Sequence, residues 1–93
     1  MNLDEAQQLF ERGPDGVQEG NHRRAAGEAI PDLREADLYG LELPGINLSG
    51  ARLHGGCLCE AKLVNADFRR AVLHSANLAS VTAVGACFVD ADL

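Results

Sequence analysis

The sequence contains few large aromatic side chains. Its 93 residues include no tryptophan, one tyrosine and three phenylalanines. A chain of this length suits one small domain, and large rings usually contribute much of the apolar surface that such a domain buries. Without them, an ordinary compact core would have to be built from Leu, Val and Ala. A stacked repeat avoids this difficulty, because each layer needs only medium and small side chains.

Paired cysteines and long apolar runs are also missing. Three cysteines are an odd number and too few for a disulfide scaffold, which favours a reducing compartment. No stretch approaches membrane-spanning length, and the N-terminus is acidic where a secretory signal would be basic. We therefore expect a soluble, cytoplasmic protein with no membrane partner.

The chain has no clustered excess of basic residues. Its net charge of −6 is spread along the sequence, with six acids and three arginines in residues 1–30, and eight acids and five bases in residues 31–93. A nucleic-acid footprint normally shows as a basic patch, so we expect no nucleic-acid partner. His22, Arg23 and Arg24 form a small basic cluster, which we interpret as a solvated helix face.

The first thirty residues follow a helical period. Asn2 with Glu5 three residues later forms a capping-box pattern, and the apolar residues that follow share one helix face: Leu3, Ala6, Leu9 and Phe10. Gly13-Pro14 should end this helix. Asp15 is then expected to cap a second helix with Gln18 at its third position, and Gly20 and Gly27 weaken this helix. We interpret these residues as a helical leader that caps the rest of the chain.

From Pro31 onward the sequence repeats every five residues. The central position of each repeat is large and apolar, except for Ala83; the positions are Leu33, Leu38, Leu43, Leu48, Leu53, Leu58, Leu63, Phe68, Leu73, Leu78, Ala83, Phe88 and Leu93. Alanine predominates two positions earlier, a polar residue stands one position earlier, and the fifth position is rich in turn formers. In a helix, a five-residue spacing would distribute these side chains over all faces. We therefore expect short extended segments joined by corners and stacked in coils.

Several segments of this repeat resemble the consensus of pentapeptide-repeat proteins, which is Ala, then Asp or Asn, then Leu, then two variable residues. The matching segments are Ala36-Asp37-Leu38, Ala66-Asp67-Phe68, Ala76-Asn77-Leu78 and Ala91-Asp92-Leu93. The resemblance implies a mainly β fold, a right-handed quadrilateral β-helix or solenoid with twenty residues per coil. We therefore expect an N-terminal α-helical cap over residues 1–30 and about three coils over residues 31–93.

Two stacked pairs are predicted by the twenty-residue period. Phe68 and Phe88 should lie in one inner column, and His54 and His74 in one outer column. The thirteen central residues should form the structural core. We also expect the last layer to lack a cap, so that an end-to-end interface forms through Leu73, Leu78, Phe88 and Leu93. Either a second copy covers this end, or the chain is a piece of a longer protein.

The cysteines and histidines do not follow a familiar metal-binding pattern. Cys57 and Cys59 lie on one outer face, with His54 across a corner and His74 one coil above. Thiolate and imidazole both bind zinc, but this spacing matches no finger or ribbon, and we expect the side chains of adjacent outward positions to diverge. We interpret them as surface cysteines and predict no metal and no cofactor.

A nucleophilic enzyme would need a serine, cysteine or histidine beside a base in a pocket. The hydroxyl residues Ser49, Ser75, Ser80 and Thr82 fall in outer or corner positions of a convex surface, so we predict no enzyme.

We predict a non-catalytic protein-protein interaction or scaffold module with a protein partner of unknown identity. One alternative is a DNA mimic that acts on a type II topoisomerase such as gyrase, because the family includes acidic rods of that kind. The basic residues Arg52, Lys62, Arg69 and Arg70 interrupt an acidic strip and weigh against it. A second alternative is a structural subunit of a larger assembly.

Overall fold

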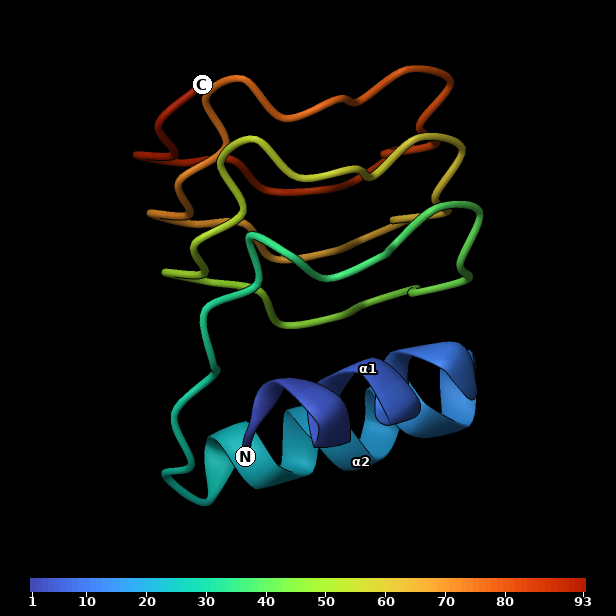
Figure 1. The fold of residues 1–93 in the computed structure, drawn as a ribbon, viewed down its shortest axis with the longest axis vertical. Helices are drawn as coiled ribbons and strands as arrows, with labels where there is room; N and C mark the ends of the chain where they lie inside the picture. The colour runs from blue at the N-terminus through green and yellow to red at the C-terminus, as the bar shows by residue number, and fades with distance from the viewer.

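Two helices lie beneath a stack of four-sided turns. The computed structural model describes residues 1–93, with α1 at Leu3–Glu11 and α2 at Pro14–Ala25. The chain then rises through the coil to the C-terminus at the opposite end (Figure 1). Neither helix combines the length and the apolar character that a bilayer crossing requires.

Helix α1 begins with the capping box expected from the sequence. The Glu5 N–H donates to Asn2 Oδ1 at 2.8 Å, and the Asn2 N–H donates to Glu5 Oε1 at 3.0 Å. Two of the free N–H groups at the start of the helix are thereby satisfied. The apolar face of α1 buries Ala6, Leu9 and Phe10, and Leu3 is half-buried, so the prediction is confirmed at the cap and for three of the four residues on the face.

Helix α2 begins differently from the prediction. Asp15 is not its N-cap; Gly13 takes that place without a side-chain bond, and Pro14 opens the helix. Proline suits the first helical position because its fixed φ is already helical and its missing N–H would have no partner there. Helix α2 crosses α1 at Gly16, which is buried and so close that an added Cβ would lie 1.7 Å from the Leu9 carbonyl oxygen.

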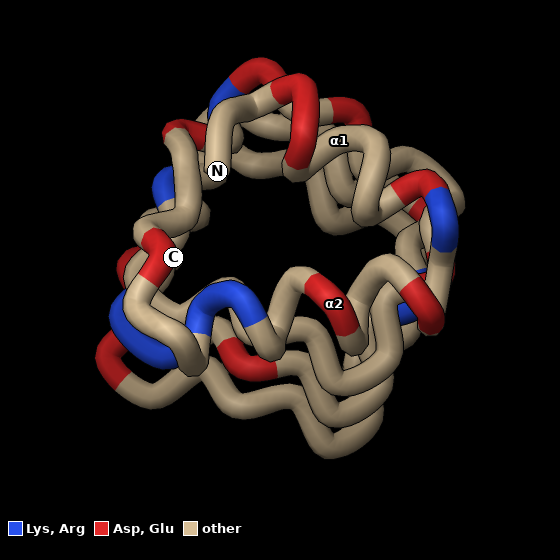
Figure 2. The backbone as a smooth tube through the Cα atoms, turned by 90° about the horizontal axis from the view of Figure 1, so that it is seen from below, with Lys and Arg blue, Asp and Glu red and all other residues tan.

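The coil is held together by parallel bridges between residues twenty positions apart. The first joins Asp37 to Cys57 and the last joins Val72 to Asp92. Each bridge involves a single residue on either side, and no longer strand or sheet forms. The expected β-helix is therefore present only as isolated bridges, because a corner at every fifth residue leaves one residue per side that can pair in both directions. In projection the coil has an angular outline, and the helices lie across its lower end (Figure 2).

The corners require backbone with positive φ. At a representative corner the Ala61 N–H donates to the Leu58 carbonyl at 3.0 Å and Glu60 has a φ of 60°, the arrangement of a type II turn. Glycine takes this place at several corners. Residues with a side chain take it at six others: Glu60, Asn65, Arg70, Ser75, Ser80 and Asp90. These six positions carry the steric cost of left-handed backbone.

Nine of the thirteen central residues form the core as predicted, and the four in the last coil do not, because no layer covers them within residues 1–93. All nine from Leu33 to Leu73 are at most 2% exposed, Ala83 and Phe88 are half-buried, and Leu78 and Leu93 are exposed. The two predicted stacks are confirmed. The rings of Phe68 and Phe88 are 5.1 Å apart and nearly parallel, and the rings of His54 and His74 are 4.9 Å apart.

Candidate interaction surfaces

The lower edge of the coil is paired with side chains of the leader. Gln7 of α1 donates from Nε2 to the Asp37 carbonyl at 2.7 Å, and its Oε1 accepts the Asp37 N–H at 3.0 Å. The amide thus makes both bonds that a residue in a lower coil would make. Burying a peptide edge without partners costs free energy, so this pairing closes the lower end of the stack.

Helix α2 closes a second side of the same edge. Asn21 donates to the Gly45 carbonyl at 2.9 Å and accepts the Asn47 N–H at 2.8 Å. Arg24 donates to the carbonyls of Asn47 at 3.0 Å and Ser49 at 3.1 Å. Its burial in this contact lowers the pKa of the guanidinium. The lower end is therefore a completed interface within the chain.

The basic cluster on α2 is not the solvated face that we predicted. Arg24 lies against the coil, as described above, and half-buried Arg23 bonds Glu28 at 2.9 Å and Glu5 at 3.3 Å. Only His22 of the three is exposed. Sequence reasoning missed these capping roles. Asn21 and Arg24 stand three residues apart, a spacing that puts them on one helix face, but nothing in the sequence marks that face as the one toward the coil.

The upper edge of the coil has no such cover within residues 1–93. In the coils below, N–H groups of central residues donate to the next coil, as Leu58 does to the Asn77 carbonyl at 2.9 Å. The corresponding N–H groups of Leu78, Ala83 and Phe88 have no backbone partner. Carbonyls that accept in lower coils are unpaired here too: those of Val81, Ala86 and Ala91.

Apolar side chains surround this upper edge. Leu93 is 72% exposed and Leu78 is 37% exposed, and the outward Val84 and Val89 are exposed as well. Leu73 does not belong to this surface, although we expected it there. It is 2% exposed, because it lies one coil below Leu93 and its N–H donates to the Asp92 carbonyl of the last coil.

The outer face is organised by side chains that bridge two residues along the chain. Asp67 Oδ1 accepts the Arg69 N–H at 3.0 Å, and the same carboxylate binds the Arg69 guanidinium at 2.8 Å. These bonds lower the pKa of Asp67. Four other side chains accept the backbone N–H of the residue two positions on in the same way: Asp32, Asp37, Asn47 and Asn77. This turn bond explains why Asp or Asn precedes the central leucine.

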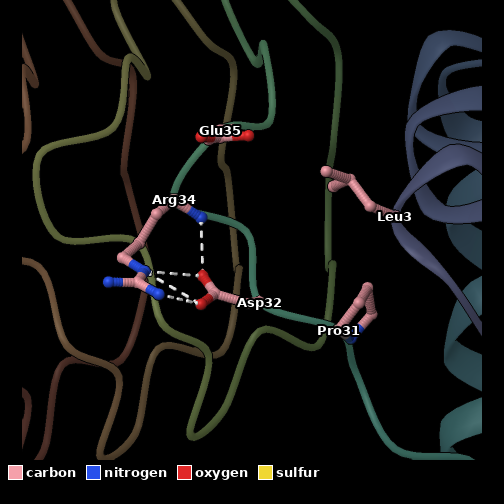
Figure 3. Close-up of a pocket in the computed structure, with 5 residues that line it drawn as sticks. All are labelled: Leu3, Pro31, Asp32, Arg34 and Glu35. Atoms are coloured by element: carbon pink, nitrogen blue, oxygen red, sulfur yellow. Dashed lines mark hydrogen bonds and ion pairs between the residues drawn. The ribbon is translucent and has the colours of Figure 1, made fainter.

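A recess of about 570 Å³ lies between the start of α1 and the first corner of the coil. Its walls are Leu3, Pro31, Asp32, Arg34 and Glu35 (Figure 3). Arg34 lies against the Asp32 carboxylate, and its hydrogen bonds lower the pKa of Asp32 to about 2. The two charged groups therefore neutralise one another, and the recess holds no nucleophile beside a base.

The predicted hydroxyl residues are not gathered at one site. Ser49 Oγ donates to Asn47 Oδ1 at 2.7 Å, while Ser75 and Ser80 stand at separate corners. Thr82 is exposed on the last coil. The four residues thus do not combine into a catalytic group.

The cysteine pair differs from the prediction. The side chains of Cys57 and Cys59 do not diverge: their Sγ atoms are 3.1 Å apart. His54 lies in its stack with His74, and its Nδ1 is buried without a partner. Burial, with a smaller effect from His74, lowers the pKa of His54. No group of three or more His, Cys, Asp and Glu side chains is arranged to hold a metal ion.

Together the five-residue sides, the twenty-residue bridges and the inward leucines define a solenoid with a helical cap. Residues 32–63 and 58–93 match the family model for pentapeptide repeats, in eight copies. These matches span more than half of the sequence, and the chain belongs to the pentapeptide-repeat family. A comparison with curated proteins finds no matching relative.

Proposed function

We propose that this protein is a non-catalytic protein-protein interaction module, and that its last coil binds a second copy of the chain. The difference between the two ends of the coil carries the proposal. The lower end is closed by Gln7, Asn21 and Arg24, whereas the upper end presents unpaired backbone groups and exposed leucines. An edge of this kind is a template for further pairing.

A second copy suits the upper edge because the edge carries both kinds of hydrogen-bonding group. The unpaired N–H groups of Leu78 and Phe88 are donors, and the unpaired carbonyls of Val81 and Ala86 are acceptors. A two-fold axis brings the same surface of each copy together, so such an edge is complementary to itself. Leu78 and Leu93 would then lose their contact with water, which favours association.

The outer face supports a protein module better than a DNA mimic. Ion pairs along the coil neutralise several of the acids, among them Asp67 with Arg69 at 2.8 Å and Glu42 with Lys62 at 3.6 Å. In projection, acidic and basic residues of the helices and the coil are mixed around the molecule and do not form one strip (Figure 2). A protein that replaces DNA needs a continuous negative potential, which such pairs interrupt.

Two finer expectations belong to the same proposal. We infer that the coil winds in the right-handed sense typical of the family, and that the protein works in a reducing compartment such as the cytoplasm. The three unbonded cysteines support the second point.

Light scattering coupled to size-exclusion chromatography tests the dimer, with residues 1–93 as the sample. We expect the wild type to dimerise with a dissociation constant of about 100 µM or lower. A dissociation constant of about 100 µM corresponds to a free energy of binding of about −5.5 kcal/mol. Leu93→Asp places a charge in the interface and should give a monomer. Tyr39→Ser is the control, because Tyr39 is also exposed but lies in the first coil. A wild-type monomer at concentrations up to about 100 µM would rule out the second copy as partner.

A further inference from the structure

Cys57 stands where the coil elsewhere uses a side chain to bridge a corner. At five equivalent positions an Asp or Asn accepts the N–H of the residue two positions on: Asp32, Asp37, Asn47, Asp67 and Asn77. The corner geometry therefore brings these two positions together. At Cys57 the partner two positions on is Cys59, and the contact joins two thiols whose Sγ atoms are 3.1 Å apart.

We propose that Cys57 and Cys59 form a redox-active dithiol that exchanges with low-molecular-weight disulfides and closes into an internal disulfide. Both cysteines are unbonded and half-buried on the outer face, so a small reagent reaches them. Leu58 between them is fully buried, which anchors the backbone that carries both thiols. The coil thus holds the pair together before any reaction, and a preorganised pair closes at high effective concentration.

The surroundings leave the pair accessible on one side. Ala79 lies one coil above Cys59, because the Glu60 N–H next to Cys59 donates to the Ala79 carbonyl at 2.9 Å. A methyl side chain at that place leaves room above the Cys59 sulfur, whereas Asn77 lies one coil above Cys57. On the other side Tyr39 bonds the Glu60 carboxylate, which borders the pair with an aromatic ring and a negative charge.

The two thiols have different roles in the exchange. The hydrogen bond with Cys57, together with burial, raises the pKa of the Cys59 thiol. Cys59 also lies 3.9 Å from the Asn77 carbonyl oxygen, a second acceptor for its proton. We therefore assign the first attack to Cys57, because the Asn77 carbonyl can hold the Cys59 proton and no such acceptor contacts the Cys57 sulfur.

The exchange balances in two displacement steps. The Cys57 thiolate attacks one sulfur of a small disulfide, forming a mixed disulfide and releasing one small thiolate. Cys59 then passes its proton to that thiolate, attacks Cys57 Sγ and expels the second small thiolate, which takes up the proton that Cys57 had released. The two protein thiols are oxidised to one disulfide, and the small disulfide is reduced to two thiols.

The product should be easily reversed. Only Leu58 separates the two cysteines, so the disulfide closes a small ring, and strained or exposed disulfides are the ones most readily reduced. The bond would therefore form and open with the redox state of its surroundings, on a face that the core does not depend on.

Oxidised glutathione is the probe for the test. The whole chain is incubated with it, quenched in acid and alkylated, and the cysteine peptides are examined by mass spectrometry. We expect the peptide with Cys57 and Cys59 to lose two hydrogens and to carry no glutathione. Cys87 is the control within the same molecule: it has no thiol neighbour and should remain free or carry glutathione. Cys57→Ser and Cys59→Ser should each leave the remaining thiol as a stable mixed disulfide.

The contribution of the fold is measured by repeating the reaction in urea. We expect the equilibrium ratio of internal disulfide to free dithiol to be about tenfold or more higher in the folded chain than in the unfolded chain, because the coil preorganises the pair. Equal formation in both states would overturn the role of the fold. Glutathione retained on both cysteines, or a bond between two chains instead of within one, would overturn the proposal itself.

Discussion

The side-chain amide of Gln7 forms two hydrogen bonds with the backbone of Asp37, one as donor and one as acceptor. It takes the place that a bridging residue of a lower coil would hold, so the stack ends on a side chain. Asn21 repeats the arrangement with Gly45 and Asn47 on another side. These side chains therefore prevent a further coil from pairing with the lower edge.

Gln7→Ala should lower the free energy of unfolding by about 1 kcal/mol, because the Asp37 N–H and carbonyl lose their partners at a partly water-accessible edge. The midpoint of urea denaturation measures the change. Gln8→Ala is the matched control, since Gln8 is exposed and forms no side-chain hydrogen bond. Equal midpoints for the two variants would mean that the amide pairing does not stabilise the cap.

Gly16→Ala should destabilise the protein by about 1 to 3 kcal/mol, because the new Cβ would meet the Leu9 carbonyl oxygen at 1.7 Å and push α1 from α2. Gly20→Ala makes the same chemical change in the same helix. There the Cβ meets only Leu9 Cδ1, at 3.9 Å, so the gain in helix propensity should stabilise by up to about 1 kcal/mol. Thermal unfolding compares the two, and shifts of the same sign would contradict the close helix contact.

Ser75→Gly should stabilise the coil by about 0.5 kcal/mol. Ser75 has a φ of 61°, and glycine removes that steric cost while adding some entropy to the unfolded chain. Gly55 occupies the same corner one coil below, with a φ of 72° and no atom within 4 Å of an added Cβ. Gly55→Ala should therefore cost about 1 kcal/mol from backbone strain alone. Denaturant titration of both variants should give opposite signs; equal signs would show that φ does not govern these corners.

Stability should decrease with acidification through the titration of His54. Burial lowers its pKa in the folded state below 6.5, with smaller effects from His74, Arg34 and Arg52 that outweigh the attraction of Asp32. The unfolded chain then binds the proton more readily, so stability is complete above about pH 6.5 and is lost as the pH falls from there toward the folded pKa. Denaturation midpoints at about pH 7.5 and pH 5 measure the loss.

His54→Gln should lose less stability between these two pH values than the wild type, because its side chain takes up no proton. His22→Gln is the control, since His22 is exposed on α2 and lies outside the stack of His54 and His74. A wild-type slope that survives in His54→Gln would assign the effect to other groups.

Much of the coil could be predicted from the repeat itself. Leu33 through Leu73 point inward because their positions in the five-residue period are equivalent, and the stacks of Phe68 on Phe88 and His54 on His74 follow from four such units per coil. The capping box at Asn2 is similarly local, since its partners are three residues apart. The start of α2 was predicted two residues too late, because Pro14 has two local roles, as a helix breaker and as a first helical residue.

The sequence by itself determined the coil and the residues that fill it, because each five-residue unit repeats the same backbone conformation and the same inward side chain. Only the tertiary structure decided how the ends and the outer face are used. Gln7 meets Asp37 across 30 residues, Gly16 meets the backbone of Leu9, and Cys57 meets Cys59 at a corner. These contacts depend on how the helices sit on the coil and on how side chains turn at its corners, and a periodic pattern carries no information on either.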